Sequence, residues 1–317
     1  MLKHKLWKLI GLVILAYILS RIDWPQFLQV VRDAKITLIL TAFLLNIPQL
    51  WLKSTRWQAL LSAQGKRIKN VDAFLYYLGA TYLGVITPGR VGEFVKALYL
   101  KQHGIATISY GFSSVLVDRL WDLLLLVVLG LAGLIVIHPF EYAALIGWVG
   151  LAGLVGLLAF LIFSSSIGKV AGIIYGKFLS SKIPKAAKEG AGRFGDGLRD
   201  LWGKRIGLSA GLTCLAYGLF FLQCALIAQG FGLPLSYVEI VPIMAMVNLF
   251  SFLPVSVSGL GTRDAALLFL LTRRGLGYES IVAFSMGILI VFYVGGGLMG
   301  IAAWLVRPIS LKKVKLR

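Results

Sequence analysis

Ionic side chains inside apolar stretches are the residues of this chain that could do chemistry. Arg90 and Glu93 lie in the Thr-Pro-Gly-Arg-Val-Gly-Glu segment 87–93, in the middle of an apolar stretch, and Lys96 follows three residues after it. A charge inside a bilayer is costly and is usually functional. Proline and glycine break a helix here, and the helix that starts near Gly92 is expected to point free N–H groups into the membrane. Together with Arg90, this helix end suits a phosphate or a carboxylate.

A second apolar stretch is broken in a similar way. Gly259 and Gly261 lie in this break, and Arg263 and Asp264 take the places of the earlier arginine and glutamate. The pairing resembles an inverted repeat whose half-helices meet near the membrane midplane, as in secondary transporters. Two kinks that serve only helix packing are the alternative, but packing does not explain an arginine and an acid at both breaks.

A third group of charges consists of Asp118, Arg119 and Asp122. The two aspartates are four residues apart, so they share a helix face, where like charges repel. A nearby cation, or protonation of one carboxylate, would relieve this cost. Arg119, Arg90 and Lys96 are the candidate partners. The alternative is that this helix begins in water and that the three charges are merely interfacial.

No metal, cofactor or catalytic group is predicted. Cys214 and Cys224 are ten residues apart in one apolar segment, about 15 Å along a helix and too far for a disulfide. His4, His103 and His138 are too scattered for a zinc or haem site. The candidate substrate-binding residues are Arg90, Gly92, Glu93, Lys96, Asp118, Arg119, Asp122, Gly259, Gly261, Arg263 and Asp264.

The composition places these charges in a membrane protein. Residues of the hydrophobic class make up 58% of the 317 residues and charged residues 14%, against about 25% charged residues in a soluble domain. The mean hydropathy is +0.85. A soluble enzyme is therefore excluded. The formal charge of +19 indicates topology signals and contacts with anionic lipid headgroups rather than nucleic acid.

The apolar runs predict an all-α, polytopic integral membrane bundle. The two broken stretches, 71–100 and 238–271, are expected to form re-entrant helical hairpins of opposite orientation. Eight plain spans are the alternative. The six full spans are expected at residues 9–19, 36–51, 109–137, 142–163, 206–229 and 281–305.

The second of these spans is expected to end at the membrane surface. Asn46 and Pro48 inside it predict a kink that faces protein rather than lipid. The aromatic and basic residues that follow have the composition of an interfacial belt. They are Trp51, Lys53, Arg56 and Trp57.

Lysine and arginine counts set the expected orientation. Residues 164–205 hold nine of them, so the basic connections and both termini are placed in the cytoplasm of a cell with this protein in its plasma or inner membrane. The chain is treated as one domain, 1–317, with halves 1–163 and 206–317 joined by the basic linker. Residues 194–202 of the linker fit an amphipathic helix on an anionic membrane surface, or equally a solvated loop.

The segments 87–93, 118–122 and 253–264 resemble the lysylphosphatidylglycerol synthase transmembrane family, the flippase-like half of the multiple peptide resistance factors. Asp118 and Asp264 stand where the family pattern has Glu. The resemblance implies a polytopic protein that moves a lipid between leaflets. Aminoacylated phosphatidylglycerol is one substrate named in the family, and polyprenyl-phosphate-linked sugars are suggested for some relatives. The sequence ends twelve residues after the last span, so no synthase activity is expected, although a separate lipid-modifying synthase is a possible partner.

The leading hypothesis is therefore a lipid flippase, not an enzyme, whose partners are membrane lipids with anionic headgroups. Two alternatives stay open. One is an intramembrane enzyme acting on a lipid phosphate, with the Asp118 and Asp122 pair as its only candidate group. The other is a membrane scaffold that transports nothing. The lipid, the driving force and the oligomeric state are not predicted.

Overall fold

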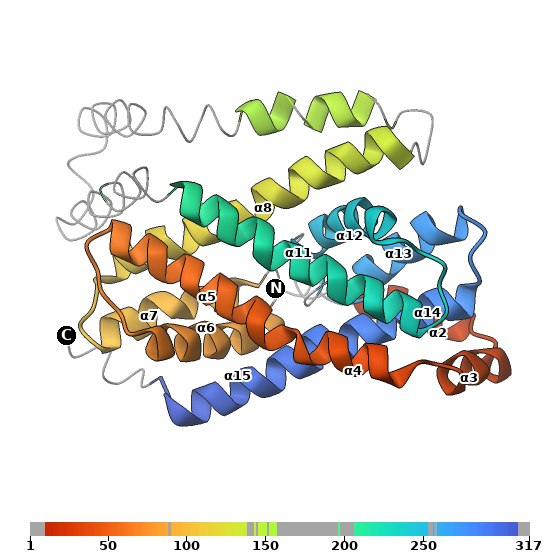
Figure 1. Ribbon diagram of the computed structural model, residues 1–317, viewed down its shortest axis with the longest axis horizontal. Helices are drawn as coiled ribbons and strands as arrows, with labels where there is room; N and C mark the ends of the chain where they lie inside the picture. Colours follow the sequence, from red (N-terminus) through yellow and green to blue (C-terminus); the bar gives the residue numbers. More distant parts are fainter. Residues whose placement is uncertain are drawn as a thin grey trace, which may run out of the picture.

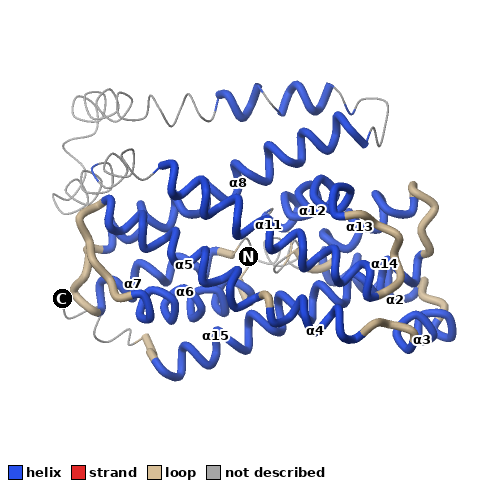
Figure 2. The backbone as a smooth tube through the Cα atoms, in the orientation of Figure 1, coloured by secondary structure: helices blue, strands red, loops and turns tan. Residues whose placement is uncertain are grey.

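The computed structural model describes residues 10–87, 90–137, 143, 145–150, 152–156, 196, 206–252, 256 and 259–309. Across these residues the backbone forms helices, turns and loops and no strand, which confirms the all-α class (Figure 2). Three of the described helical segments are long and apolar enough to cross a membrane. They are Ile36–Ala63, Ile206–Gly230 and Tyr278–Val306.

The described chain opens with a helix, a surface helix and a long interrupted span. These are α2 (Ile10–Ser20), α3 (Trp24–Arg32), α4 (Ile36–Leu44) and α5 (Asn46–Ala63). The interruption between α4 and α5 carries Asn46, whose buried Nδ2 donates to the carbonyl oxygens of Phe43 at 3.0 Å and Val291 at 2.8 Å. The predicted kink facing protein is confirmed, because the side chain joins α4 to the last span rather than to lipid.

The first broken stretch forms two helices that are separated at the predicted break. They are α6 (Asn70–Val85) and α7 (Val95–Gln102), and a 3₁₀ turn, η2 (Val91–Phe94), precedes α7. The long helix α8 (Ile108–Ile137) follows and matches the predicted span.

The second half repeats this order of elements. Helix α11 (Ile206–Gly230) is followed by the broken pair α12 (Tyr237–Phe252) and α13 (Thr262–Thr272). The last span consists of α14 (Tyr278–Ile288), the π-helical segment η3 (Leu289–Val294) and α15 (Gly295–Val306). Both predicted helix breaks are therefore present in the structure.

The two broken pairs lie at opposite ends of the molecule. In Figure 1, α6 and α7 lie at the left, beside the end of α5, whereas α12 and α13 lie at the right, beside the end of α11. Helices α5 and α11 themselves run along the long axis and pack against each other.

Corresponding helices of the two halves also have corresponding neighbours. Helix α6 of the first pair packs on α15, and α12 of the second pair packs on α8. Each second helix packs on the span that follows it, α7 on α8 and α13 on α14. Each first helix also packs on the preceding span, α6 on α5 and α12 on α11. Two related halves arranged as an inverted repeat produce this pattern of neighbours.

Several sequence predictions fall outside the described residues. They concern the N-terminal end of the first span, nearly all of the linker 164–205 with its amphipathic segment 194–202, and part of the span 142–163. The division into halves with a cytoplasmic linker therefore stays a prediction.

Glycine residues allow helices of the two halves to pack closely against each other. A Cβ added to Gly300 on α15 would lie 2.5 Å from Tyr82 Cβ and 2.6 Å from the Leu78 carbonyl oxygen on α6. A Cβ on Gly133 of α8 would lie 2.5 Å from Pro242 Cβ on α12. Small residues let membrane helices approach until their backbones touch, so both large interfaces depend on a missing side chain.

The Gly300→Ala substitution is expected to destabilise the protein by about 1–3 kcal/mol, because its methyl group overlaps the backbone of α6. Gly297→Ala is the matched control on the same helix, since nothing lies within 4 Å of its added Cβ. Unfolding in detergent, followed for both variants and the wild type, measures the difference. An equal effect of the two substitutions would contradict the described packing of α6 on α15.

Candidate functional site

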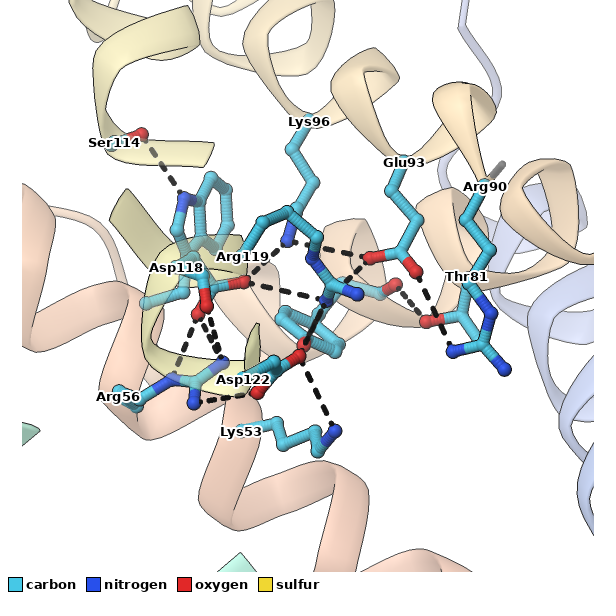
Figure 3. Close-up of polar contacts among 12 residues, drawn as sticks. Lys53, Arg56, Thr81, Arg90, Glu93, Lys96, Ser114, Asp118, Arg119 and Asp122 are labelled. Atoms are coloured by element: carbon cyan, nitrogen blue, oxygen red, sulfur yellow. Dashed lines mark hydrogen bonds and ion pairs between the residues drawn. The ribbon is translucent and has the colours of Figure 1, made fainter. Parts of the chain in front are cut away.

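The predicted charges of the first half form one buried group, which we call the ionic cluster (Figure 3). Its members come from α5, from the first break together with α7, which follows it directly, and from α8, so three parts of the chain meet there. They are Lys53, Arg56, Arg90, Glu93, Lys96, Asp118, Arg119 and Asp122.

Arg56 joins the two aspartates of α8. Its Nη2 lies 2.7 Å from Asp118 Oδ1, and its Nη1 lies 2.8 Å from Asp122 Oδ1. Nη2 also donates to the Asp118 backbone oxygen at 3.0 Å, and Nη1 to Thr213 Oγ1 of α11 at 3.0 Å. All three ionic side chains are almost completely buried. The repulsion expected between the aspartates is thus relieved by one shared guanidinium group.

The interfacial belt predicted after the second span is wrong for three of its four residues. Arg56 and Trp57 are fully buried and Lys53 nearly so, whereas Trp51 alone is exposed. The physical reason is that the helix continues to Ala63 inside the bundle. There Lys53 and Arg56 face the aspartates of α8, and the Trp57 indole N–H donates to Ser114 Oγ at 3.2 Å.

Two of the three cation partners that the sequence predicted for the aspartates are confirmed. Lys96 Nζ lies 2.8 Å from Asp118 Oδ2, and Arg119 Nη2 lies 3.3 Å from Asp122 Oδ2. Arg119 also pairs with Glu93 at 2.6 Å. The third candidate, Arg90, contacts Glu93 at 4.0 Å and neither aspartate. Lys96 Nζ also lies 3.8 Å from Glu93 Oε2.

Aromatic rings surround the lysines of the ionic cluster. Lys96 Nζ lies 4.2 Å from the ring centre of Tyr77 and 5.6 Å from that of Trp57. Lys53 Nζ lies 4.4 Å from the ring centre of Tyr217 on α11. These cation–π contacts favour the ammonium groups where they are buried.

Exposure divides the ionic cluster into two layers. The most exposed side chains are cations, with Arg90 at 28%, Arg119 at 13% and Lys53 at 11%. Glu93, Asp118 and Asp122 are exposed by at most 4%. The carboxylates, together with the fully buried Arg56 and Lys96, therefore lie behind these three cations.

The first break exposes a guanidinium group but not the amides that the sequence led us to expect. The Gly92 N–H donates to Thr87 Oγ1 at 2.7 Å, and the Glu93 N–H donates to the Arg90 carbonyl oxygen at 3.1 Å. Arg90 has φ of 56°, and no other non-glycine residue of the described chain has a positive φ. Such a backbone costs about 1 kcal/mol or more and is concentrated at functional sites.

At the second break, the Asp264 carboxylate accepts hydrogen bonds from the backbone and side chains around it. Asp264 Oδ2 accepts the Gly261 N–H at 2.8 Å, and Asp264 Oδ1 accepts Arg263 Nη2 at 2.6 Å and the Ser285 hydroxyl. Gly261 has φ of 81°, and a Cβ on it would lie 2.0 Å from the Gly11 carbonyl oxygen of α2. Gly259 likewise has a positive φ and lies against Ser251. Close backbone packing therefore explains these glycines.

The two breaks meet at Tyr293. The Arg90 guanidinium carbon lies 5.7 Å from the centre of this ring, and that of Arg263 lies 5.1 Å from it. Tyr293 belongs to the π-helical segment η3 in the middle of the last span. A π-helical turn inside an α-helix is frequently found at functional sites. Here it places one aromatic ring within 6 Å of both guanidinium carbons.

Sequence reasoning missed three residues of this site. Lys53 and Arg56 follow an apolar run and have the usual composition of a membrane boundary, although the two aspartates of α8 did require cations from elsewhere. Tyr293 lies in an unbroken apolar span, and nothing in its local sequence distinguishes it.

The described residues contain no group of three or more His, Cys, Asp and Glu side chains arranged to hold a metal ion. Cys214 and Cys224 are unpaired, as their spacing predicted.

Replacing Arg56 by glutamine is expected to destabilise the protein by about 3–5 kcal/mol, because two buried carboxylates lose their shared partner. Arg307→Gln is the control, since Arg307 pairs with Asp72 at 3.0 Å on the surface and such pairs contribute at most about 1 kcal/mol. The free energy of unfolding in detergent compares the two. Adding Asp118→Asn to Arg56→Gln is expected to restore part of the loss. Equally small losses for both arginines would show that the Arg56 pairs stabilise nothing.

Comparison with known proteins places the chain among membrane proteins. A relative, the UPF0104 membrane protein MJ1595 of Methanocaldococcus jannaschii, is 23% identical over 341 residues, which cover 99% of this chain and 100% of that protein. The family model described as lysylphosphatidylglycerol synthase TM region matches residues 8–300. The match includes both helix breaks and the whole ionic cluster. This chain is therefore a multi-pass membrane protein that belongs to the lysylphosphatidylglycerol synthase TM region family.

Proposed function

We propose that the protein is a lipid flippase, which moves a phospholipid or a polyprenyl-phosphate-linked lipid between the two leaflets of a membrane. Membership of the family supports a function related to membrane lipids. The contacts of the two broken helix pairs support the finer statement that the lipid is transported.

The meeting of both breaks at Tyr293 carries this proposal. Helices α6–α7 and α12–α13 lie at opposite ends of the molecule (Figure 1), yet Arg90 and Arg263 contact one aromatic ring. Broken helices that meet near the middle of a membrane form the substrate sites of many transporters. A headgroup held between these arginines would be reached from either leaflet when one pair moves, while its acyl chains stay in the bilayer.

The ionic side chains take different roles in this mechanism. Arg90 and Arg263 bind the phosphate, and Lys53 and Arg119 add positive potential beside it. The four acids, Glu93, Asp118, Asp122 and Asp264, position these cations. Charge-assisted hydrogen bonds from arginine to phosphate are short and strong, so two guanidinium groups suffice to draw a headgroup out of water.

Transport is favoured over the chemistry of a lipid-phosphate enzyme. Asp118 and Asp122, the only candidate pair for such chemistry, are each within 3.0 Å of the Arg56 guanidinium group. A carboxylate held in this way is a poor base, because the paired guanidinium stabilises its charged form. We therefore propose that the protein is not an enzyme and that a separate synthase modifies the lipid where modification is needed.

We propose a cell-membrane location with both termini in the cytoplasm. The turn between α5 and α6 carries Lys66, Arg67 and Lys69 and would face the cytoplasm by the positive-inside rule. At the opposite end, the positive charge of Arg274 is neutralised by Glu239 at 2.7 Å. By the same rule, this end is placed outside the cell.

The double substitution Arg90→Ala, Arg263→Ala is expected to reduce lipid translocation in proteoliposomes at least tenfold. One charge-assisted hydrogen bond contributes about 1.5–3 kcal/mol, and about 1.4 kcal/mol corresponds to a factor of ten. The assay follows the loss of a fluorescent phospholipid from the outer leaflet after a membrane-impermeant quencher is added.

The matched control is Arg274→Ala, which removes an arginine of the surface and is expected to keep the wild-type rate. Protein-free vesicles give the background. Wild-type transport by the double variant would show that the two breaks do not form the headgroup site.

A further inference from the structure

We infer that the transported headgroup is a lipid phosphomonoester, which carries close to two negative charges and no amine. This inference rests on the proposed transport function and assigns its substrate class. A lipid with a cationic aminoacyl headgroup is excluded by the same observations.

The first observation is the charge balance of the ionic cluster. Five basic side chains, Lys53, Arg56, Arg90, Lys96 and Arg119, face the three carboxylates of Glu93, Asp118 and Asp122. Each lysine ammonium lies within 4.0 Å of a carboxylate oxygen, so both lysines are counted as charged. Two positive charges are left over in a largely buried site. At the second break, Arg263 is balanced by Asp264.

An unbalanced pair of charges is expensive to bury, so the site is complete only when a ligand supplies two negative charges. A phosphomonoester has a charge of about −1.5 to −2 at pH 7. A phosphodiester headgroup supplies only one charge, and a lysyl headgroup adds positive charge where there is already an excess.

The second observation is that every carboxylate of the site is buried beside basic side chains. Glu93, Asp118 and Asp122 are exposed by at most 4%, and each is within 4.0 Å of at least two basic side chains. Asp264 is buried and accepts hydrogen bonds from Gly261, Arg263 and Ser285. An amine entering the site would meet the exposed cations of Lys53, Arg90 and Arg119 before it reached a carboxylate.

The third observation is a set of buried donors that lack an acceptor. Arg90 Nε, Arg119 Nε and Arg263 Nη1 have no hydrogen-bond partner within the described chain, and Arg263 as a whole is 2% exposed. Buried donors normally find partners. A phosphomonoester offers three oxygens that accept hydrogen bonds, and Arg90 and Arg263 already lie on the same ring.

The test compares headgroups on the wild-type protein in two measurements. Thermal unfolding in detergent measures binding of short-chain phosphatidate, phosphatidylglycerol, lysylphosphatidylglycerol and inorganic phosphate. Proteoliposomes measure translocation of fluorescent forms of the three lipids. We expect phosphatidate to raise the unfolding temperature most and to move at least tenfold faster than lysylphosphatidylglycerol, with phosphatidylglycerol between them.

A single substitution tests whether the surplus positive charge sets the headgroup preference. Arg90→Gln removes one of the two surplus charges at a partly exposed position, and it is expected to slow phosphatidate about tenfold and phosphatidylglycerol by much less. Arg274→Gln, an exposed arginine at one end of the molecule, is the control and is expected to leave the headgroup preference unchanged. Equal slowing of both lipids by Arg90→Gln would overturn the role of the surplus charge.

The outcomes distinguish this inference from the proposed function. Lysylphosphatidylglycerol moving as fast as phosphatidate would overturn the headgroup class and leave transport standing. Stabilisation by phosphatidate without translocation of any lipid would support the headgroup class and overturn transport. Inorganic phosphate that stabilises the protein as well as phosphatidate does would identify free phosphate as the ligand and overturn the lipid assignment.

Discussion

The structure depends on the burial of two like charges on one helix. Asp118 and Asp122 lie on the same face of α8, away from water, and a buried carboxylate without a partner costs several kcal/mol. Their cations come from α5 and α7 as well as from α8 itself. Arg56 also bonds Thr213 of α11. The need to neutralise the two aspartates therefore fixes the relative positions of these helices. The ionic cluster thus holds the helices of the first half together and also gives that half its positive electrostatic potential.

The need to pair buried polar groups also explains the structure of the two helix breaks. A broken helix in a membrane must satisfy the backbone groups that it frees, and here side chains within each break do so. Thr87 accepts the Gly92 amide and Asp264 accepts the Gly261 amide. Because these amides are already bonded, we propose that the arginines beside them, Arg90 and Arg263, recognise the ligand. The π-helical turn of the last span carries Tyr293, whose ring lies near both guanidinium groups.

The sequence predicted the features that depend on local chemistry. The positions of both breaks, the all-α membrane class, and the pairing of Asp118 with Lys96 follow from the cost of charge, proline and glycine in hydrocarbon. The belt assigned to Trp57 and Arg56 was wrong, because a basic and aromatic segment looks the same whether a helix leaves the membrane or continues into the bundle. Tyr293 could not be found, because its role comes from tertiary placement alone.

An experimental structure of the protein with short-chain phosphatidate bound tests most directly whether the two breaks serve one headgroup. We expect the phosphate beside Tyr293, within hydrogen-bond distance of both Arg90 and Arg263, with Arg56 still paired to the two aspartates. A phosphate bound away from these arginines, or arginines that contact different ligands at separate places, would contradict this view of the site.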